Sequence, residues 1–250
     1  MQEKMRGSLA APNTDHGLMQ LVAIVTMIID HIGAIFFPGV LMLRVIGRIA
    51  FPLFCWGIAV GADKTRHFTR YALRLLALGV VSQPFYMLAL NHTWSQLNVL
   101  ATLLLGLLAV RGLQINRYGS AWWAPAVCLL LATAITMDYG WQGVLLIILM
   151  YLARHTKGGL AALMISFCLL WGSGSLAVFR GVSVNSGLNM LDRAVNAHIA
   201  RISLQFLAIL ALPLMMIKTK SGIRLPKWLS YAAYPGHLMI LWLIKLWLRG

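Results

Sequence analysis

The sequence predicts an all-α, polytopic integral membrane protein, built as one bundle of about nine transmembrane helices. Three observations predict this fold class. First, 60% of the 250 residues are hydrophobic and only 11% are charged, whereas soluble domains are about 45–50% apolar and about 25% charged. Second, most of the chain consists of apolar stretches, several of them near the roughly 20 residues that a helix needs to cross a bilayer. Third, the basic residues gather in short loops between these stretches.

Nine hydrophobic segments follow one another along the chain. The fourth and sixth are short, so we expect one of them to be tilted, extended by its flanks or re-entrant. A polar tail, residues 1–17, precedes the first segment and contains no apolar core of a signal peptide, so we expect the first segment to remain as a transmembrane helix. Residues 18–250 then form a single transmembrane domain. The segments lie near 18–37, 42–61, 70–90, 97–110, 121–137, 141–153, 159–179, 199–217 and 228–248.

The positions of Lys and Arg predict the orientation of the bundle. With the N-terminus inside, 14 of the 21 basic residues fall in cytoplasmic segments, as the positive-inside rule requires. Nine spans then place the C-terminus outside, and a re-entrant segment would reverse the orientation of everything after it. Because these charges flank apolar runs rather than alternating with exposed aromatic residues, the expected partner is the lipid bilayer and no nucleic acid. Cys55, Cys128 and Cys168 lie singly in apolar runs, which predicts neither disulfides nor a zinc site.

The clearest polar feature at membrane depth is MIIDHIG, which places Asp30 and His31 inside the first segment. A charge at the bilayer centre costs about 2.5–3.5 kcal/mol on insertion scales, so it usually faces the bundle interior with a partner. Histidine exchanges its proton near neutral pH, and a carboxylate can orient it and support the imidazolium. Adjacent helical residues point about 100° apart, so one of the two can instead pair with the next helix. The structural alternative is an ion pair at a helix end or a buried histidine with satisfied hydrogen bonds.

The second feature is LRVIGRIAFPLF, in which Arg44 and Arg48 are four residues apart and share one helical face. Gly47 permits a close approach of another element, and we expect Pro52 to kink the helix a turn after Arg48. Arg48 can hold an anionic group such as a phosphate or carboxylate. It can equally form a structural ion pair with Asp30.

The other polar candidates are less specific one by one. Gln83 and Asn98 lie near segment ends, where hydrogen bonds between helices are the simpler interpretation. Asp138 and the adjacent Tyr139 begin a short segment, where a helix N-cap explains Asp138 as well as chemistry does. His237, in YPGHLMI, lies near a segment start, and interfacial packing is the simpler interpretation for it.

Taken together, the polar residues fall towards the extracytoplasmic half of the bundle, which predicts one polar pocket that opens outwards. The histidines of the polar loops, among them His92, are expected to be solvated. The sequence contains no GxSxG, HExxH, P-loop or GxGxxG motif, so neither a serine nucleophile nor a metal site is expected. The residues that converge on this pocket are Asp30, His31, Arg44, Arg48, Asn98 and Asp138.

Six sequence blocks resemble the TraX family, the membrane proteins whose founding member N-acetylates conjugative F-type pilin. The blocks run along nearly the whole chain: LVAIVTMIIDHIGAIF, LRVIGRIAFPLF, NVLATLLLGLLAV, MDYGWQGVLLIILMYL, LQFLAILALPLMM and YPGHLMILWLI. The Asp-His pair together with the Gly-Arg-x-Ala-Phe-Pro block is specific, whereas the Leu-rich blocks are not. The family is also distantly similar to the acyltransferase-three type of membrane acyltransferase, which takes acyl groups from acyl-CoA and uses a histidine of its first helix.

The resemblance implies a multi-pass protein of the bacterial inner membrane that transfers an acetyl group from acetyl-CoA to the N-terminal amine of a pilin subunit. Acyl transfer to an amine needs a base and a group that stabilises the tetrahedral oxyanion. His31 is then the expected base, with Asp30 orienting it or pairing with Arg48. Arg48 is the expected clamp for the oxyanion or the donor. The expected substrate-binding residues are Asn98, as a donor to the acyl carbonyl, together with Asp138, Tyr139, His237, Arg44 and Gln83.

One position departs from the pattern of these enzymes. Acyltransferase-three enzymes carry Arg eleven residues before the histidine, and many TraX relatives carry Lys, whereas this chain has Gln20. If that cation normally holds the donor, donor binding here requires another cation. The basic loops 64–74 and 218–227 are candidate sites for the phosphates of the donor, although ordinary positive-inside topology also explains them.

Two further interpretations are open at this point. The same chemistry can serve another acceptor, namely a glycan, a lipid or the amine of another protein. A different class is a transporter or a non-enzymatic pilus-assembly factor. The sequence lacks the paired halves with broken helices that are typical of transporters, and an assembly factor has no need of an Asp-His pair at membrane depth.

Overall fold

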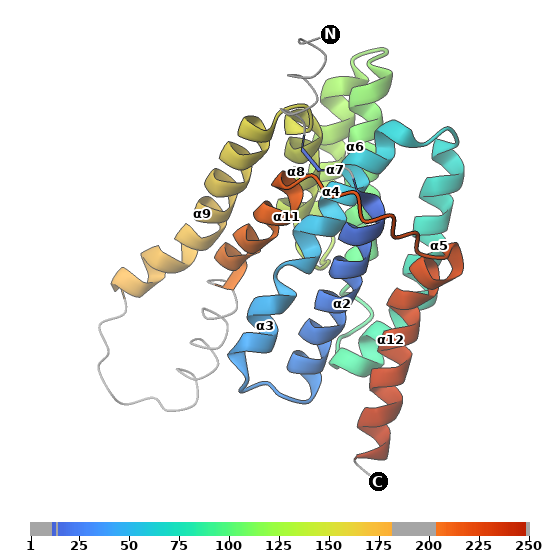
Figure 1. The fold of residues 1–250 in the computed structure, drawn as a ribbon, viewed down its shortest axis with the longest axis vertical. Coiled ribbons are helices and arrows are strands. Elements are labelled where there is room, and N and C mark those ends of the chain that lie inside the picture. Colours follow the sequence, from blue (N-terminus) through green and yellow to red (C-terminus); the bar gives the residue numbers. More distant parts are fainter. Residues whose placement is uncertain (1–11, 14, 182–203, 249–250) are drawn as a thin grey trace.

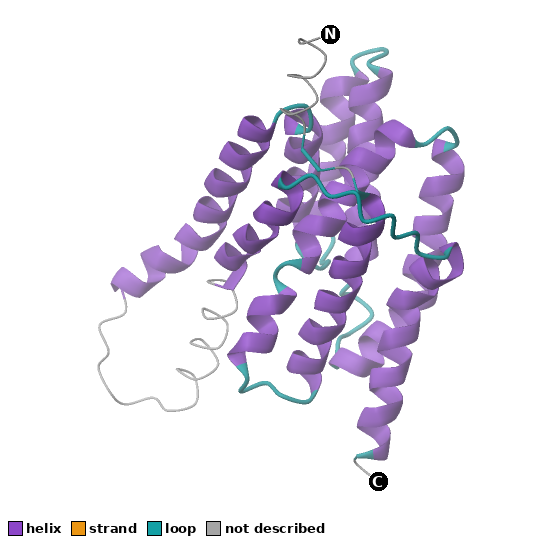
Figure 2. Cartoon of the chain, viewed as in Figure 1, coloured by secondary structure: helices purple, strands orange, loops and turns teal. Residues whose placement is uncertain are grey.

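The computed structural model describes residues 12–13, 15–181 and 204–248, and these are almost entirely helical (Figures 1 and 2). The predicted all-α fold class is confirmed. In this part of the chain the only strand-like pairing is an isolated parallel bridge between Leu97 and Met137. The helices are α2 (His16–Ile35), α3 (Leu41–Gly47), α4 (Ala50–Lys64), α5 (Phe68–Leu90), α6 (Val99–Ile115), α7 (Ser120–Ala134), α8 (Gly140–Ala153), α9 (Lys157–Gly181), η1 (Leu204–Ala211), α11 (Leu212–Met216) and α12 (Lys227–Trp247).

Each predicted hydrophobic segment coincides with a helix or with two consecutive helices of the described residues. The short fourth segment is extended by its flank, because α6 continues to Ile115. Three stretches are long and apolar enough to cross a membrane, namely His16–Ile35, Leu41–Lys64 and Phe68–Leu90. The number of nine spans therefore stays a prediction. The predicted loop 180–198 and the start of segment 199–217 lie largely outside the described residues.

Asparagine and aspartate residues cap the ends of several helices. Asp15 caps α2 by accepting a hydrogen bond from the Leu18 amide at 3.3 Å. Asn98 caps α6 by accepting one from the Leu100 amide at 3.0 Å. At the C-terminal end of α5, Asn91 adopts a left-handed conformation with φ 57°, which asparagine tolerates better than most residues. These caps fix where the loops between helices begin.

The second predicted segment is broken into α3 and α4 at Arg48 and Ile49. Pro52 lies in the first turn of α4, where a proline is tolerated because the amides of a first turn have no helical partner. The break therefore lies one turn before the proline. It places Arg48 at the end of α3, where its backbone amide still bonds the carbonyl of Arg44 at 3.2 Å.

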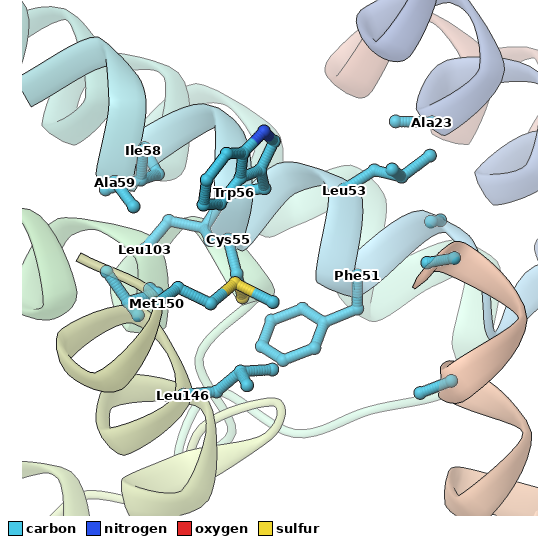
Figure 3. Packing of buried hydrophobic residues seen from close by; sticks show 14 of the residues in the cluster. Ala23, Phe51, Leu53, Cys55, Trp56, Ile58, Ala59, Leu103, Leu146 and Met150 are labelled. Carbon is cyan, nitrogen blue, oxygen red and sulfur yellow. The ribbon is translucent and has the colours of Figure 1, made fainter. Parts of the chain in front are cut away.

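Helix α4 forms the centre of the core. Ten of its fifteen residues are buried, and a helix that is apolar on all faces is typical of an interior position. Figure 3 shows Phe51 and Cys55 of α4 among Leu146 and Met150 of α8. Trp56 is fully buried on the same helix. This packing fixes the orientation of α4 and so of the Arg48 junction that precedes it.

The segment between α11 and α12 crosses the ends of α4 and α2 (Figure 1). Asn13 ties it to the residues before α2, since its side-chain amide donates to the Thr219 hydroxyl at 3.0 Å and its backbone amide donates to the Met215 carbonyl, just before the segment, at 2.7 Å. Hydrogen bonds from Ser221, foremost from its backbone amide, lower the pKa of Asp15 to about 2. The crossing segment leads to α12, which packs against α5 and α2 and thereby brings His237 to His31.

Candidate functional site

Asp30 forms ion pairs with Arg44 of α3 and with Arg48, which directly follows this helix. Its carboxylate accepts hydrogen bonds from Arg44 Nη1 at 2.8 Å and from Arg48 Nη2 at 2.8 and 3.0 Å. Arg44 also donates to the Asp30 backbone carbonyl at 3.1 Å, and Arg48 Nε donates to the Arg44 carbonyl at 3.3 Å. Asp30 and Arg48 are buried, so this pairing compensates for their desolvation. Two guanidinium groups against one carboxylate leave the cluster with one excess positive charge.

Close packing of α3 on α2 makes this pairing possible. A Cβ atom at Gly47 would overlap the Asp30 side chain, and one at Gly33 would lie 2.7 Å from the Cβ of Leu43. Glycine at both positions therefore allows the two helices to approach each other closely. The predicted close approach at Gly47 is thus made by the Asp30 carboxylate itself.

His31 contacts His237 rather than Asp30. Nδ1 of His31 lies 2.6 Å from Nε2 of His237, and Nδ1 of His237 lies 2.6 Å from the carbonyl oxygen of Ala233. The two imidazole rings are parallel within 3° with centroids 4.9 Å apart, which fits a hydrogen bond in the common plane of the rings. The adjacent residues Asp30 and His31 thus have separate partners on separate helices.

Asp138 and Tyr139 lie in the turn between α7 and α8. The Asp138 amide donates to the Leu97 carbonyl at 3.0 Å, and Thr102 donates its hydroxyl hydrogen to the Asp138 carbonyl. Tyr139, and not Asp138, occupies the N-cap position of α8, without a side-chain cap. The ring of Tyr139 stacks on Phe51 with centroids 3.5 Å apart.

The carboxyl of Asp138 is half-buried and lies outside the helices. Burial raises its pKa to about 6, although the Tyr86 hydroxyl and the Arg48 charge act in the opposite direction. The Tyr86 hydroxyl is buried and makes no well-formed hydrogen bond within the described residues, so it compensates only part of the desolvation. Asp138 therefore changes its charge close to neutral pH.

These groups surround one cavity of about 570 Å³, which we call the polar cavity. Of the residues expected from the sequence, it brings together Asp30, His31, Arg44, Arg48, Asp138 and Tyr139. His237 contacts the Nδ1 atom of His31 and does not line the cavity. Sequence reasoning missed His92, Gln96, Gln142, Trp171, Gln205 and Tyr234, which also line it.

His92 shows why some of these were missed. The sequence placed it among solvated loop residues, because Asn, Thr and Trp surround it. In the structure its ring packs on Tyr86 with centroids 4.8 Å apart and it lines the polar cavity. Only the path of the loop after α5 brings it there, and no local sequence signal indicates that path.

Asn98 and Gln83 are hydrogen-bonded to each other and do not line the polar cavity. Asn98 donates its two amide hydrogens to the Gly79 carbonyl at 2.8 Å and to Gln83 Oε1 at 2.9 Å. Gln83 donates in turn to the Gln96 carbonyl at 2.7 Å. Both side chains join helices and a loop, so neither amide group of Asn98 is available for an acyl carbonyl.

A second cavity of about 410 Å³ adjoins the first, and we call it the apolar cavity. Four residues line both cavities and form the wall between them: Met27, Phe54, Val99 and Tyr234. The apolar cavity extends towards the ends of helices that carry His16, Gly61 and Tyr231. Arg74 donates to the Tyr231 hydroxyl at 3.2 Å, so a cation lies beside its mouth. Gln20 lines this cavity.

The polar cavity suits an anion or a polarised carbonyl better than a metal ion. Its fixed charges are two arginines paired with one carboxylate. Within the part of the chain that the structure describes, no three His, Cys, Asp or Glu side chains come together in an arrangement that would hold a metal. The groups that a ligand would meet include the His31 ring, the guanidinium of Arg48 and the carboxyl of Asp138.

Comparison with known proteins gives a family match along most of the chain. A family model described as TraX protein matches residues 16–245. No solved structure matches the chain.

Two curated relatives are similar over shorter stretches. An uncharacterized protein of Rickettsia prowazekii (strain Madrid E) is 29% identical over 149 residues, which cover 57% of this chain and 57% of that protein. A protein of Dichelobacter nodosus, named Probable fimbrial assembly protein FimC, serogroup H1, is 36% identical over 114 residues, or 39% of this chain and 47% of that protein. The chain thus spans about half the length of these relatives. Because the family model covers residues 16–245, the chain belongs to the TraX family.

Proposed function

We propose that this protein is a membrane acyltransferase that moves an acetyl group from acetyl-CoA to the N-terminal amine of a pilin subunit. The observation that carries the proposal is the polar cavity itself, in which His31 and Arg48 line one space next to a second cavity that contains no charge. A base beside a cationic group is what acyl transfer to an amine requires.

His31 supplies the base in this proposal. Its Nδ1 is held by His237 at 2.6 Å, so Nε2 is the ring nitrogen left for a substrate. The α-amine of a protein has a pKa near 7.7–8.0 and is a nucleophile only after it loses a proton. Asp138, on the same cavity, offers an anion that attracts the ammonium form of the amine before this proton is removed.

Arg48 stabilises the negative charge that develops on the carbonyl oxygen. Within the described residues its guanidinium donates through Nε and Nη2, which leaves Nη1 for a ligand. Asp30 holds the guanidinium in place, and the excess positive charge of the cluster stabilises an oxyanion electrostatically. Such preorganised donors contribute about 10²- to 10³-fold to rate in other acyl-transfer enzymes.

The apolar cavity is the proposed path of the donor. On the positive-inside orientation its mouth faces the cytoplasm, where acetyl-CoA is available, and the polar cavity faces the other side, where a processed pilin N-terminus lies. An uncharged pantetheine arm can enter an uncharged cavity at a small desolvation cost. Arg74 beside Tyr231 and Lys64, one turn beyond Gly61, are cations for the phosphates.

The reaction then balances without a further reactant. The bound ammonium first releases one proton to solvent. The neutral amine nitrogen then forms a bond to the thioester carbon, its second proton passes to Nε2 of His31, and the oxyanion is held by Arg48. As the C–S bond breaks, the thiolate sulfur receives the proton from His31 and leaves as CoA. The wall of Met27, Phe54, Val99 and Tyr234 must open enough for the thioester to reach His31.

The pilin is the proposed acceptor on two grounds. The resemblance to the TraX family implies it, and one relative carries the name of a fimbrial assembly protein. An amine, a glycan or a lipid can each serve as an acyl acceptor, and the first experiment tests the amine of a pilin directly.

Intact mass spectrometry of candidate pilins is the test, in cells with the wild-type protein, with His31→Ala and with His67→Ala. His67 is an exposed histidine between α4 and α5 and serves as the matched control. We expect a gain of one acetyl group with the wild type and His67→Ala, and a loss of at least about 100-fold in His31→Ala, the usual contribution of a general base. An unmodified pilin in wild-type cells would exclude pilin as the acceptor, and full acetylation by His31→Ala would exclude His31 as the base.

A further inference from the structure

We propose that His237 is a positioning residue that fixes the tautomer of His31, so that Nδ1 of His31 carries the hydrogen and Nε2 is left with its lone pair towards the polar cavity. The significance for catalysis rests on the proposed acyltransferase function. The protonation pattern itself follows from the geometry of α2 and α12 and is testable without any substrate.

The backbone carbonyl of Ala233 determines which ring nitrogen of His237 carries the hydrogen. A carbonyl oxygen only accepts, and Nδ1 of His237 lies 2.6 Å from it. Nδ1 of His237 must therefore carry a hydrogen and donate it. A neutral imidazole has one protonated and one unprotonated nitrogen, so Nε2 of a neutral His237 has only a lone pair to offer.

That lone pair determines the state of His31. Nδ1 of His31 lies 2.6 Å from Nε2 of His237 in the plane shared by the two rings. Two lone pairs at this distance would repel, so Nδ1 of His31 must donate. In a neutral His31 the remaining nitrogen, Nε2, is then unprotonated, which is the form that a base needs.

Both rings are expected to be neutral in the resting protein. His237 is buried, with 7% of its surface exposed, and burial disfavours a charged imidazolium. Arg44 and Arg48 line the same cavity as His31 and disfavour a further cation there, although an ionised Asp138 on that cavity offsets part of this effect. When His31 later accepts a proton at Nε2, its Nδ1 hydrogen bond to His237 becomes charge-assisted and stabilises the imidazolium.

His237 does not itself line the polar cavity, whereas His31 does. It reaches that position because α12 packs on α2 and α5. Lys245, two turns further along α12, fixes this packing by donating to the Ala89 carbonyl and the Asn91 side chain, both at 2.8 Å. His237 thus acts through His31, in the way that a second group orients the histidine of other acyl-transfer sites.

Three variants separate positioning from simple packing. In His237→Gln the amide oxygen reaches the place of the imidazole Nε2 and can still accept from His31. The shorter side chain of His237→Asn carries the same amide group but does not reach that place, and His237→Leu offers no acceptor. We expect His237→Gln to keep at least about a tenth of the acetylation rate, and His237→Asn and His237→Leu to lose about 100-fold, with melting temperatures in detergent close to the wild type for the two amide variants. Equal rates for the Gln and Asn variants would overturn the proposal.

The decisive measurement is ¹⁵N NMR of histidine-labelled protein in nanodiscs at pH 8, with the His31 signals assigned by comparison with His31→Asn. We expect His31 to be protonated at Nδ1 and unprotonated at Nε2 in the wild type and His237→Gln, and to change in His237→Asn. A wild-type His31 protonated at Nε2 would refute the role of His237 whatever the activity. The proposed tautomer without acetylation of any acceptor would instead keep the role of His237 in orienting His31 and refute the acyltransferase function.

Discussion

The two adjoining cavities differ in the charge of the residues that line them. The polar cavity has Asp30, Arg44 and Arg48 in its wall, held by ion-pair contacts of 2.8 to 3.0 Å. Among the described residues the apolar cavity has no Asp, Glu, Lys or Arg in its wall and is lined largely by aliphatic and aromatic side chains. One space therefore favours charged or polarised groups, and the other favours an uncharged chain.

The glycines of the two cavities show the same difference. At Gly47 a Cβ would overlap the Asp30 side chain. Buried charges need close contact with their partners, and glycine at this position lets Asp30 lie close to the arginines. At Gly57, on the wall of the apolar cavity, a Cβ would meet open space. Glycine thus allows tight contact in the first case and leaves room in the second. We infer that the first cavity is a rigid site and the second a space for a bound chain.

The largest effect is expected from Gly47→Ala. The added methyl group would displace Asp30 from Arg48, and such overpacking typically costs about 1–3 kcal/mol. Because the oxyanion clamp is displaced as well, acetylation should fall by at least about 100-fold. Thermal unfolding in detergent and the acetylation rate measure the two consequences.

Gly57→Ala is the matched control for this substitution. It adds the same methyl group on the neighbouring helix without a clash with Asp30, so neither the melting temperature nor the rate should fall as in Gly47→Ala. If Gly47→Ala behaved like Gly57→Ala, the close contact between Gly47 and Asp30 would not be needed for the site.

A larger side chain at Gly57 tests the apolar cavity. Gly57→Phe places a ring in the space proposed for the pantetheine arm, without contact to Asp30, His31 or Arg48. We expect the apparent affinity for acetyl-CoA to fall by about tenfold, equivalent to roughly 1.4 kcal/mol, while the ion-pair cluster remains intact. The stabilisation of the purified protein by acetyl-CoA in a thermal-shift assay measures this loss, with Gly57→Ala again as control.

Wild-type acetyl-CoA binding by Gly57→Phe would show that the donor takes another route. A loss of binding in both Gly57 variants would instead point to a disturbed helix α4. Only the difference between the two substitutions supports the apolar cavity as the path of the donor.

Most of the fold was predictable because it depends on local signals. Among the described residues, apolar runs and flanking charges located the helices to within a few residues, although α3 and α4 were predicted as the single segment 42–61. The pairing of Asp30 with Arg48 was one of two alternatives that the sequence left open. The spacing of Arg44 and Arg48 predicts that they share a helical face, but it does not predict which helix packs against that face. The spacing of Arg44 and Arg48 indicated a common helical face, and the structure shows that both arginines pair with Asp30.

The rest of the site depends on packing that no local pattern encodes. His237 meets His31 only because the crossing segment before α12 brings two residues 206 positions apart within 2.6 Å. His92 lines the cavity because of a loop path, and Asn98 is turned away because Gln83 and Gly79 accept its amide hydrogens. Sequence reasoning identified the residue types of the site, and the long-range contacts decided which of them face the cavity.

The smallest expected effect concerns the charge of Asp138, which distinguishes an amine acceptor from a neutral one. Burial raises the pKa of Asp138 to about 6, so its carboxyl is ionised above pH 6 and becomes neutral as the pH falls through that value. An ionised carboxylate attracts an ammonium group. The KM for a peptide with a free N-terminal amine should therefore rise about five- to tenfold as the pH is lowered from 7.5 to 5.5. A tenfold rise corresponds to a difference of one pKa unit between free and peptide-bound Asp138. In Asp138→Asn the KM should be high at both pH values, while the KM for acetyl-CoA stays unchanged because the donor binds in the apolar cavity. A KM for the peptide that rises equally in wild type and Asp138→Asn would assign the pH dependence to another group, and a neutral glycan acceptor would show no such rise at all.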